Sequence, residues 1–296
     1  MFNYIIFLLY KVLQVFFRLC PKIIVKPILN FLAFIIYKIN KEHRNIAHTN
    51  IKLAFDNKKS ENERTKIVKE SYKSLLFNMY EFIVNQFDSK EKILSKANLV
   101  GEEYVLDALK DKRKIIFIAS HYGAWELAVP YIALKFAHVS IVNRRMNNNY
   151  INEEYIKARN RNNVQMIDKR DAAKGMLRAL KKGTFLAVAV DQNTKYGIDI
   201  SFFDKKVKAT DSTARLSIKF DALLIPVFCT IEDLGKYTIE FTNPLDPRTF
   251  TNENKILELT QAQANVIENQ IRKVPNQWFW QHKRWKAYHK DLYKKK

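Results

Sequence analysis

The side chains of this sequence whose types and spacing best fit catalysis are a histidine and a glutamate, His121 and Glu126. They follow an apolar run, residues 115–119, and Gly123 between them permits a tight turn. An imidazole can take a proton from an attacking hydroxyl near neutral pH. A carboxylate on its other ring nitrogen fixes the tautomer and stabilises the imidazolium. The pattern therefore favours His121 as a general base and Glu126 as the acid that orients it.

The five-residue spacing sets a geometric condition on this pair. In a regular helix, residues five apart point about 140° away from one another. The pair therefore requires His121 to lie before the helix and to reach over its first turn. On the pattern alone, the alternative is a histidine at the end of a strand, hydrogen-bonded to the backbone.

Short β-branched and aromatic runs alternate with helix-length stretches after residue 114. The expected strands are residues 115–119, 139–142, 164–167, 185–190, 224–230 and 237–242. The expected helices are residues 60–87, 126–136, 150–162, 171–182, 211–221 and 253–273. This alternation predicts βαβ units, and hence an α/β fold with a mostly parallel central sheet flanked by helices. The last two strands lack an intervening helix and are expected to form a hairpin.

Further candidate site residues follow other expected strands. Arg144 follows residues 139–142, and Asp191 and Gln192 follow residues 185–190. If the sheet is parallel, Asp191 and Gln192 share an edge with His121, where α/β folds place their ligand sites. The alternatives are a surface salt bridge for Arg144 and loop caps for the other two.

The N-terminus predicts a membrane anchor. Residues 2–19 are nearly all apolar, and at ~1.5 Å per residue they span roughly 27 Å, close to the ~30 Å hydrocarbon core. Basic residues follow the run, whereas a cleaved signal peptide carries them before it. We expect residues 1–40 to be the anchor and residues 41–296 a catalytic domain in the cytoplasm. The first helix could span the bilayer or lie in its interface, and a buried helix pair is the alternative.

Charge and composition restrict the partners. The chain has 51 Lys and Arg against 30 Asp and Glu, an excess of 21. Such a surface attracts nucleic acid, anionic lipid or acidic proteins. The two cysteines, Cys20 and Cys229, lie far apart and form no metal-type or redox-type pair. With no metal cluster or nucleotide-binding loop in the sequence, we expect no cofactor.

The segment that contains His121 and Glu126 resembles the His-x4-Asp/Glu motif of lipid acyltransferases, particularly the late acyltransferases of lipid A biosynthesis. Other segments, in the same order along the chain, resemble further motifs of that family. They are residues 44–55 (Arg-Asn-Ile-Ala-His-Thr-Asn-Ile-Lys-Leu-Ala-Phe), 144–149 (Arg-Arg-Met-Asn-Asn-Asn), 190–193 with 202–204 (Val-Asp-Gln-Asn and Phe-Phe-Asp), and 275–286 (Pro-Asn-Gln-Trp-Phe-Trp-Gln-His-Lys-Arg-Trp-Lys). Arg145 and Asn149 stand where the family usually has proline, and Asp204 where it has glycine.

The resemblance implies transfer of a fatty acyl chain from an acyl-carrier-protein thioester to a hydroxyl of a lipid A precursor, at the cytoplasmic face of the bacterial inner membrane. It implies that His121 deprotonates the hydroxyl and that Glu126 orients His121. Arg144 is then expected to stabilise the oxyanion or to grip a phosphate of the acceptor. Asp191 and Gln192 are expected to build the site or to contact the acceptor.

Two other functions fit parts of the sequence. A glycerophospholipid or other glycolipid acyltransferase would share the His-x4-Asp/Glu motif. A basic, membrane-tethered nucleic-acid-binding protein would account for the charge, and predicts salt-sensitive binding. The tryptophans and basic residues within 278–286 fit core packing, a membrane interface or single-stranded nucleic acid. Taken with the resemblance, we expect core packing with the basic side chains turned towards lipid, and no nucleic-acid partner.

Overall fold

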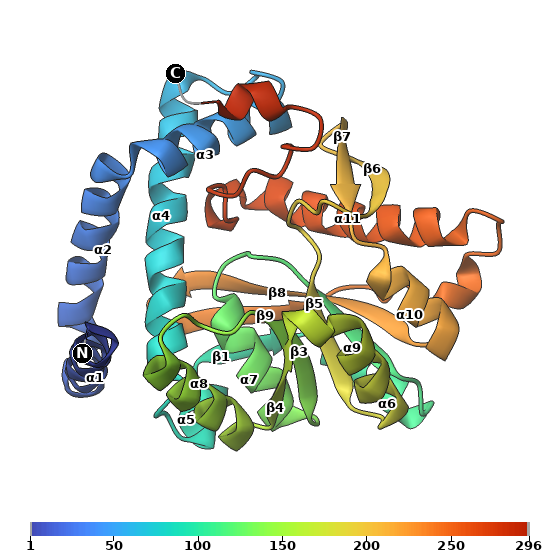
Figure 1. Cartoon of the computed structure of the whole chain (residues 1–296), viewed down its shortest axis with the longest axis horizontal. Helices are drawn as coiled ribbons and strands as arrows, with labels where there is room; N and C mark the ends of the chain where they lie inside the picture. Colours follow the sequence, from blue (N-terminus) through green and yellow to red (C-terminus); the bar gives the residue numbers. More distant parts are fainter. Residues whose placement is uncertain (1, 295–296) are drawn as a thin grey trace.

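The computed structural model describes residues 2–294, and a seven-stranded sheet forms its centre (Figure 1). In spatial order the strands are β1 (Ala97–Val100), β9 (Lys236–Phe241), β8 (Leu223–Asp233), β2 (Ile115–Ala119), β5 (Phe185–Ala189), β3 (Val139–Asn143) and β4 (Val164–Asp168). Neighbouring strands are parallel except for the β8–β9 hairpin. The predicted α/β fold with a mostly parallel sheet, and the predicted hairpin, are confirmed.

Helices that connect the strands, together with α11 after the last strand, cover both faces of the sheet (Figure 1). They are α6 (Glu102–Lys110), α7 (Trp125–Lys135), α8 (Asn149–Arg161), α9 (Ala172–Lys181), α10 (Ser212–Phe220) and α11 (Lys255–Lys273). The central strand β2 is apolar on both sides, as a strand covered on both faces requires. Ile116 and Ile118 belong to the core cluster that includes Ile267 of α11, whereas Phe117 belongs to the cluster that includes Leu127 of α7.

Four long helices precede the sheet, followed by the short helix α5 (Lys90–Leu94). The long helices are α1 (Phe2–Leu19), α2 (Lys22–Ile39), α3 (Lys41–Ala54) and α4 (Glu61–Val84). A capping box starts α4, since Ser60 Oγ accepts from the Glu63 backbone and Glu63 Oε2 from the Ser60 backbone. Among the described helices, α1 is long and apolar enough on its own to cross a membrane. The helix α2 is also largely apolar and contains Pro27.

Some elements went unpredicted from the sequence, most of them short. They are β1, α3, α6, α5 (Lys90–Leu94) and the separate hairpin β6 (Ile198–Phe202)–β7 (Lys205–Ala209), together with the 3-10 turns Lys169–Asp171, Pro247–Thr249, Pro275–Gln277 and Lys290–Tyr293. Several of these elements have only three to five residues. Such runs carry too few periods of hydrophobic alternation to be recognised.

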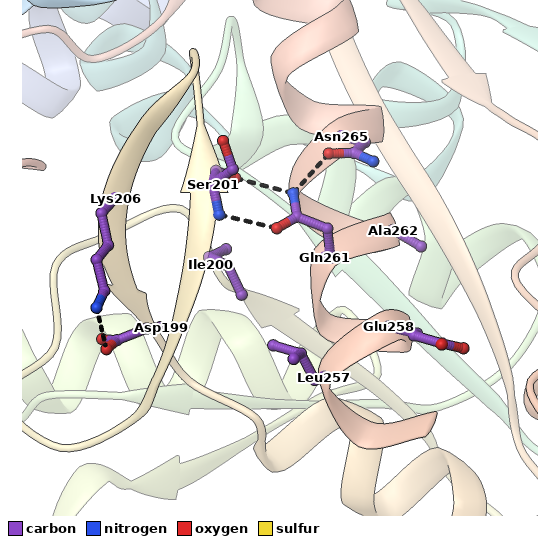
Figure 2. A pocket seen from close by; sticks show the side chains of 9 residues that line it. All are labelled: Asp199, Ile200, Ser201, Lys206, Leu257, Glu258, Gln261, Ala262 and Asn265. Carbon is purple, nitrogen blue, oxygen red and sulfur yellow. Dashed lines mark hydrogen bonds and ion pairs between the residues drawn. The ribbon is translucent and has the colours of Figure 1, made fainter. Parts of the chain in front are cut away.

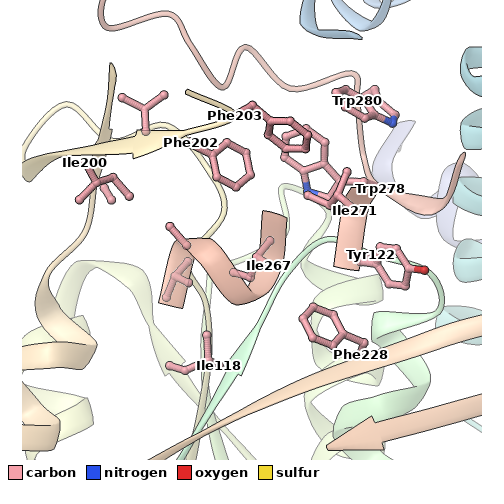
Figure 3. Close-up of a cluster of buried hydrophobic side chains, with 14 of the residues drawn as sticks. Ile118, Tyr122, Ile200, Phe202, Phe203, Phe228, Ile267, Ile271, Trp278 and Trp280 are labelled. Carbon is pink, nitrogen blue, oxygen red and sulfur yellow. The ribbon is translucent and has the colours of Figure 1, made fainter. Parts of the chain in front are cut away.

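The C-terminal tryptophans are part of the core (Figure 3). Trp278, Trp280 and Trp285 are fully buried and pack with Phe202 and Phe203 of the β6–β7 hairpin. The expected core packing is therefore confirmed. The packing of these aromatic rings holds residues 278–285 against one face of the sheet.

One basic side chain of this segment differs from expectation. Arg284 is as deeply buried as the tryptophans, and its Nη1 donates to the carbonyl oxygens of Lys208 (2.7 Å) and Gln192 (3.3 Å). Burial lowers its pKa to about 10. The guanidinium thus links β7 to the loop after β5 inside the protein and does not face lipid.

A buried ionic network joins α4 to the edge of the sheet. Lys96 Nζ lies 2.6 Å from Glu81 Oε2 and 2.8 Å from Asp88 Oδ2, and Tyr237 Oη donates to Glu81 Oε1 at 2.7 Å. All four side chains are almost completely buried. Removing one partner from such a network is costly because it leaves a charge uncompensated in a low-dielectric interior.

We therefore expect Lys96→Met to lower the free energy of unfolding by about 3–5 kcal/mol. The matched control is Lys92→Met. Lys92 also pairs with Asp88, at 2.6 Å, but its side chain is 55% exposed, so its loss is expected to cost about 0–1 kcal/mol. Denaturant unfolding of the two purified variants in detergent measures the difference, and equal small losses would contradict this account.

Candidate active site

His121 lies in the turn between β2 and α7, as its predicted place before the helix requires. Its carbonyl accepts a hydrogen bond from the Phe279 backbone N–H at 2.9 Å. Its ring makes an edge contact with Trp125, with the ring centroids 5.4 Å apart, and a looser contact with Phe279. The side chain remains 26% exposed. The ring is thus held by aromatic neighbours while part of it stays accessible.

Gly123 gives this turn its shape. Its φ is +58°, and a Cβ at this position would lie 1.9 Å from the carbonyl oxygen of Cys229 in β8. The Gly123 N–H donates to the Gln277 carbonyl at 2.9 Å, and the Ala124 N–H donates to the Cys229 carbonyl at 2.8 Å. The turn that carries His121 is therefore fastened to β8 on one side and to the C-terminal segment on the other.

Asp191 is the carboxylate that holds the His121 ring. Its Oδ1 lies 2.9 Å from His121 Nδ1, and its Oδ2 accepts from the His121 backbone N–H at 2.8 Å and from Trp278 Nε1 at 2.8 Å. It follows β5, the parallel neighbour of β2, so both residues lie at the same edge of the sheet, as predicted. Because Nδ1 faces a carboxylate, a neutral ring keeps its proton there and leaves Nε2 as the free base.

The two charges shift each other's ionisation. Burial raises the Asp191 pKa, but the charge of His121 and the hydrogen bonds from His121 and Trp278 outweigh it and lower that pKa to about 2. Burial also lowers the His121 pKa, but the charge and hydrogen bond of Asp191, followed by the charge of Glu126, leave it above its ordinary value. Asp191 is therefore ionised at neutral pH, and His121 is a stronger base than a free imidazole.

Glu126 has a different partner from the one expected. Its carboxylate pairs with Arg159 of α8, and its backbone N–H donates to Asn78 Oδ1 of α4 at 2.9 Å. In α7, Trp125 faces the His121 ring, and the next residue points about 100° further round the helix. Glu126 therefore forms an ion pair with the buried Arg159 guanidinium. It makes no hydrogen bond to His121, and its negative charge raises the His121 pKa from a distance. The hydrogen bond to the ring that the sequence assigned to Glu126 is made by Asp191.

The other two predicted residues lie at the same edge of the sheet. Gln192 is exposed, and its Nε2 lies 3.3 Å from His121 Nε2. Arg144 follows β3, and β5 lies between β3 and β2 in the sheet. The ends of β2 and β3 are therefore two strand spacings apart, roughly 10 Å in total. The Arg144 side chain is exposed in a hollow of about 710 Å³ lined by Arg144, Arg145, Met146, Asn147, Asn149, Asp168, Lys169 and Arg170. The structure thus gathers His121, Asp191 and Gln192, and places Arg144 further along the edge.

Two residues that support the site were not singled out as such from the sequence. Trp278 donates to Asp191, and His282 Nε2 accepts from the Asn193 backbone N–H at 2.8 Å. Burial lowers the His282 pKa to about 4, so this ring is a neutral hydrogen-bond acceptor. Both stand in the segment that resembles the family's C-terminal motif, and the sequence does not show that this segment folds back onto β2.

Other parts of the structure hold different features. A second hollow, of about 680 Å³, lies between β6 and α11 (Figure 2). Gln261 of α11 bonds the backbone of Ser201 there, and Lys206 pairs with Asp199. None of the residues predicted for catalysis or substrate binding lines it. Within residues 2–294, no group of three or more His, Cys, Asp or Glu side chains could hold a metal ion.

Comparison with known proteins identifies the family. Residues 1–287 match the family described as bacterial lipid A biosynthesis acyltransferase. The chain belongs to this family. Membership decides for an acyltransferase over the nucleic-acid-binding alternative, and places the chain in a membrane-associated family.

Several characterised relatives are similar to this acyltransferase. The lipid A biosynthesis lauroyltransferase of Escherichia coli is 29% identical over 83% of this chain and 80% of its own length. The lipid A biosynthesis palmitoleoyltransferase of the same organism is 26% identical over the same shares. The phosphatidylinositol mannoside acyltransferase of Mycolicibacterium smegmatis is 19% identical over 64% of this chain and 62% of its own length.

The turn at Gly123 can be tested by substitution. We expect Gly123→Ala to destabilise the acyltransferase and to remove most of its activity, because the new methyl group would displace the Cys229 backbone. Gly183→Ala is the matched control. Gly183 also has a positive φ, +75°, but nothing lies within 4 Å of a Cβ there, so only the backbone strain of about 1–2 kcal/mol is expected. Thermal unfolding and an acyl-transfer assay compare the two, and equal effects would contradict the close approach.

Proposed function

We propose that this acyltransferase moves a fatty acyl chain from the thioester of acyl carrier protein to a hydroxyl of a lipid A precursor, at the cytoplasmic face of the bacterial inner membrane. The observation that carries the proposal is the accessible His121 ring with Asp191 on its Nδ1. Family membership and the names of the similar relatives support the acceptor. The positive excess of 21 suits an acidic carrier protein and a phosphorylated lipid.

In the proposed reaction His121 is the general base. Its Nε2 takes the proton of the acceptor hydroxyl while the oxygen attacks the thioester carbonyl carbon. The tetrahedral intermediate collapses, the C–S bond breaks, and the carrier thiolate leaves. The imidazolium returns its proton to that thiolate. Asp191 keeps the ring in the tautomer that exposes Nε2 and stabilises the imidazolium.

Gln192 is proposed as the group that the acceptor replaces. Its amide nitrogen lies against Nε2, the atom that must receive the proton. The Gln192 side chain is exposed, so it can turn away without disturbing the core. An acceptor hydroxyl in the position of the Gln192 amide would donate its hydrogen bond to the Nε2 lone pair of His121.

Glu126 is proposed as a longer-range support for the base. Its negative charge adds to that of Asp191 in raising the His121 pKa. Its pair with Arg159 ties α7 to α8 and so keeps the first turn of α7 in place below the ring. Glu126 therefore acts through position and charge.

Arg144 is proposed to grip a phosphate of the acceptor. It shares its hollow with Arg145, Lys169 and Arg170, which together make a strongly basic surface. Asp168 is the acidic residue of that lining, and it already pairs with Arg170 at 2.8 Å. The roughly 10 Å between strand ends suits an acceptor whose phosphate lies some way from its reacting hydroxyl.

Mass spectrometry of lipid A tests the proposed acceptor and base. We expect a strain that lacks this protein to lose one secondary acyl chain, and expect the wild-type copy to restore it. His121→Ala is expected to restore none, because losing the base slows transfer by about 10²–10⁴-fold. His138→Ala, at an exposed histidine, is the control and should restore it fully. If the deletion leaves lipid A unchanged, a phospholipid or another glycolipid is the acceptor.

The pH profile tests the role of Asp191. Since His121 must be neutral to act, activity is expected to fall as the pH drops below its raised pKa. Asp191→Asn removes the negative charge, lowers the His121 pKa, and should move the acid limb to lower pH. The plateau rate should also fall by about 10²–10⁴-fold, because the amide no longer holds the tautomer.

A purely structural role for Asp191 would give a lower rate with an unmoved acid limb. Asp107→Asn, at an exposed carboxylate of α6, is the control and should change neither quantity. Both variants are assayed on a synthetic acyl-carrier-protein thioester and purified precursor across the pH range.

A further inference from the structure

We propose that α1 and α2 form a bilayer dock, a surface that lies in the plane of an anionic lipid bilayer, so that α1 does not cross the membrane. This goes beyond the proposed reaction and does not depend on it. The proposal rests on how α1 is attached to the catalytic domain, on which of its faces remain uncovered, and on the charge of the segment.

The helix α1 is attached to the catalytic domain from its first turn to its last. One face of it, at spacings of three and four residues, meets α8, the loop before it, and α4 with the loop that follows. The contacts are Asn3 with Asn148, Phe7 with Tyr150, Lys11 with Glu154, Gln14 with Gln86, and Phe17 with Tyr80. They include an ion pair of 2.6 Å between Lys11 and Glu154. The axis of α1 therefore follows the surface of the domain.

This attachment is incompatible with α1 as a span. If α1 crossed the bilayer along the membrane normal, hydrocarbon would surround the domain surface against which the helix packs. That surface includes α8, which exposes Glu153 and Lys157. Charged side chains are strongly disfavoured in hydrocarbon, so α1 could cross only by detaching from its contacts.

The opposite face of α1 is apolar and uncovered. Ile5, Val12 and Leu19 are seven residues apart, lie on one side of the helix, and are 48%, 66% and 76% exposed. In α2 one stripe packs inward and consists of Val25, Leu29, Ala33 and Tyr37. Its remaining faces expose Ile23, Ile24, Ile28, Phe31, Leu32, Phe34 and Ile39. A continuous apolar surface of this kind requires an apolar partner.

The two helices lie on the same side of the molecule but run in different directions. In Figure 1, α1 is viewed nearly end-on at the lower left, and α2 runs upward beside α4. Two helices with crossing axes cannot both stand normal to a bilayer, but both can lie in its plane. Their uncovered faces would then enter the same lipid layer.

Charge selects an anionic bilayer as the partner. Residues 1–41 contain six basic residues and no Asp or Glu. Lys11 and Lys26 pair with carboxylates of the rest of the chain, whereas the other four are exposed; these are Arg18, Lys22, Lys38 and Lys41. An in-plane helix with an apolar face and flanking basic residues binds anionic headgroups. The loop that follows Arg144 touches α1 through Asn148, so the basic hollow adjoins the dock. The basic hollow can bind lipid phosphates while the neighbouring apolar faces of α1 and α2 contact the acyl chains.

Depth measurements with spin labels test the orientation. The full chain with Cys20→Ser keeps only the buried Cys229, and one accessible cysteine is added in turn as Ile5→Cys, Val12→Cys or Leu19→Cys. Each is labelled with a nitroxide and bound to phosphatidylethanolamine–phosphatidylglycerol vesicles. Accessibility to oxygen and to a water-soluble nickel chelate gives the depth. Leu109→Cys, on α6 away from α1, is the aqueous control.

An in-plane α1 is expected to place the three labels within about 5 Å of one depth. A spanning α1 would place the label at position 12 about 10 Å deeper than those at both ends, which would overturn the proposal. Binding to phosphatidylcholine vesicles is expected to be roughly 10³-fold weaker, because the four exposed basic residues then meet no anionic headgroups. Spin–spin broadening between labelled chains would instead make this face an interface between copies, and the proposal would be wrong.

Discussion

The site depends on one buried carboxylate. Asp191 is almost inaccessible to solvent and accepts hydrogen bonds from the His121 backbone, the His121 ring and the Trp278 indole. A buried charge is tolerated only when its hydrogen-bonding capacity is filled. The His121 donors lie just after β2, the Trp278 donor lies in the C-terminal segment, and the acceptor Asp191 follows β5. Satisfying Asp191 therefore brings together three segments that are far apart in the sequence.

The C-terminal segment completes this arrangement. Phe279 donates from its backbone to the His121 carbonyl, and Gln277 accepts from the Gly123 N–H. The tryptophans around these contacts bury large apolar surfaces on the same face of the sheet as α11. Packing energy is thus coupled directly to the position of the base. A substitution within residues 277–279 is therefore expected to shift His121 even if the substituted residue touches no substrate.

Helix α8 links the site to the surface of the protein. Arg159 near its end pairs with Glu126 in the first turn of α7, and Glu154 one turn earlier pairs with Lys11 of α1. Asn148, just before the helix, holds the backbone of α1 next to the basic hollow. The proposed base, the proposed phosphate site and the proposed lipid contact are therefore joined by one short, rigid element. Such an arrangement suits an acceptor that presents its phosphate and its hydroxyl from a lipid layer.

The sequence alone determined the alternating α/β architecture, the hairpin near its end, the apolar first helix and the position of His121 after a buried strand. These features depend on local periodicity and on turn-forming residues, which a single sequence displays. It also indicated that Asp191 and His121 share an edge, because parallel strands end together. Only the tertiary structure decided which carboxylate meets the ring. The five-residue spacing suggested Glu126, but the direction of the first turn of α7 and the need of buried Arg159 for a counter-ion turn that side chain away. Hydrogen bonds between residues 70 or more positions apart are set by strand order and packing, and no local pattern records them.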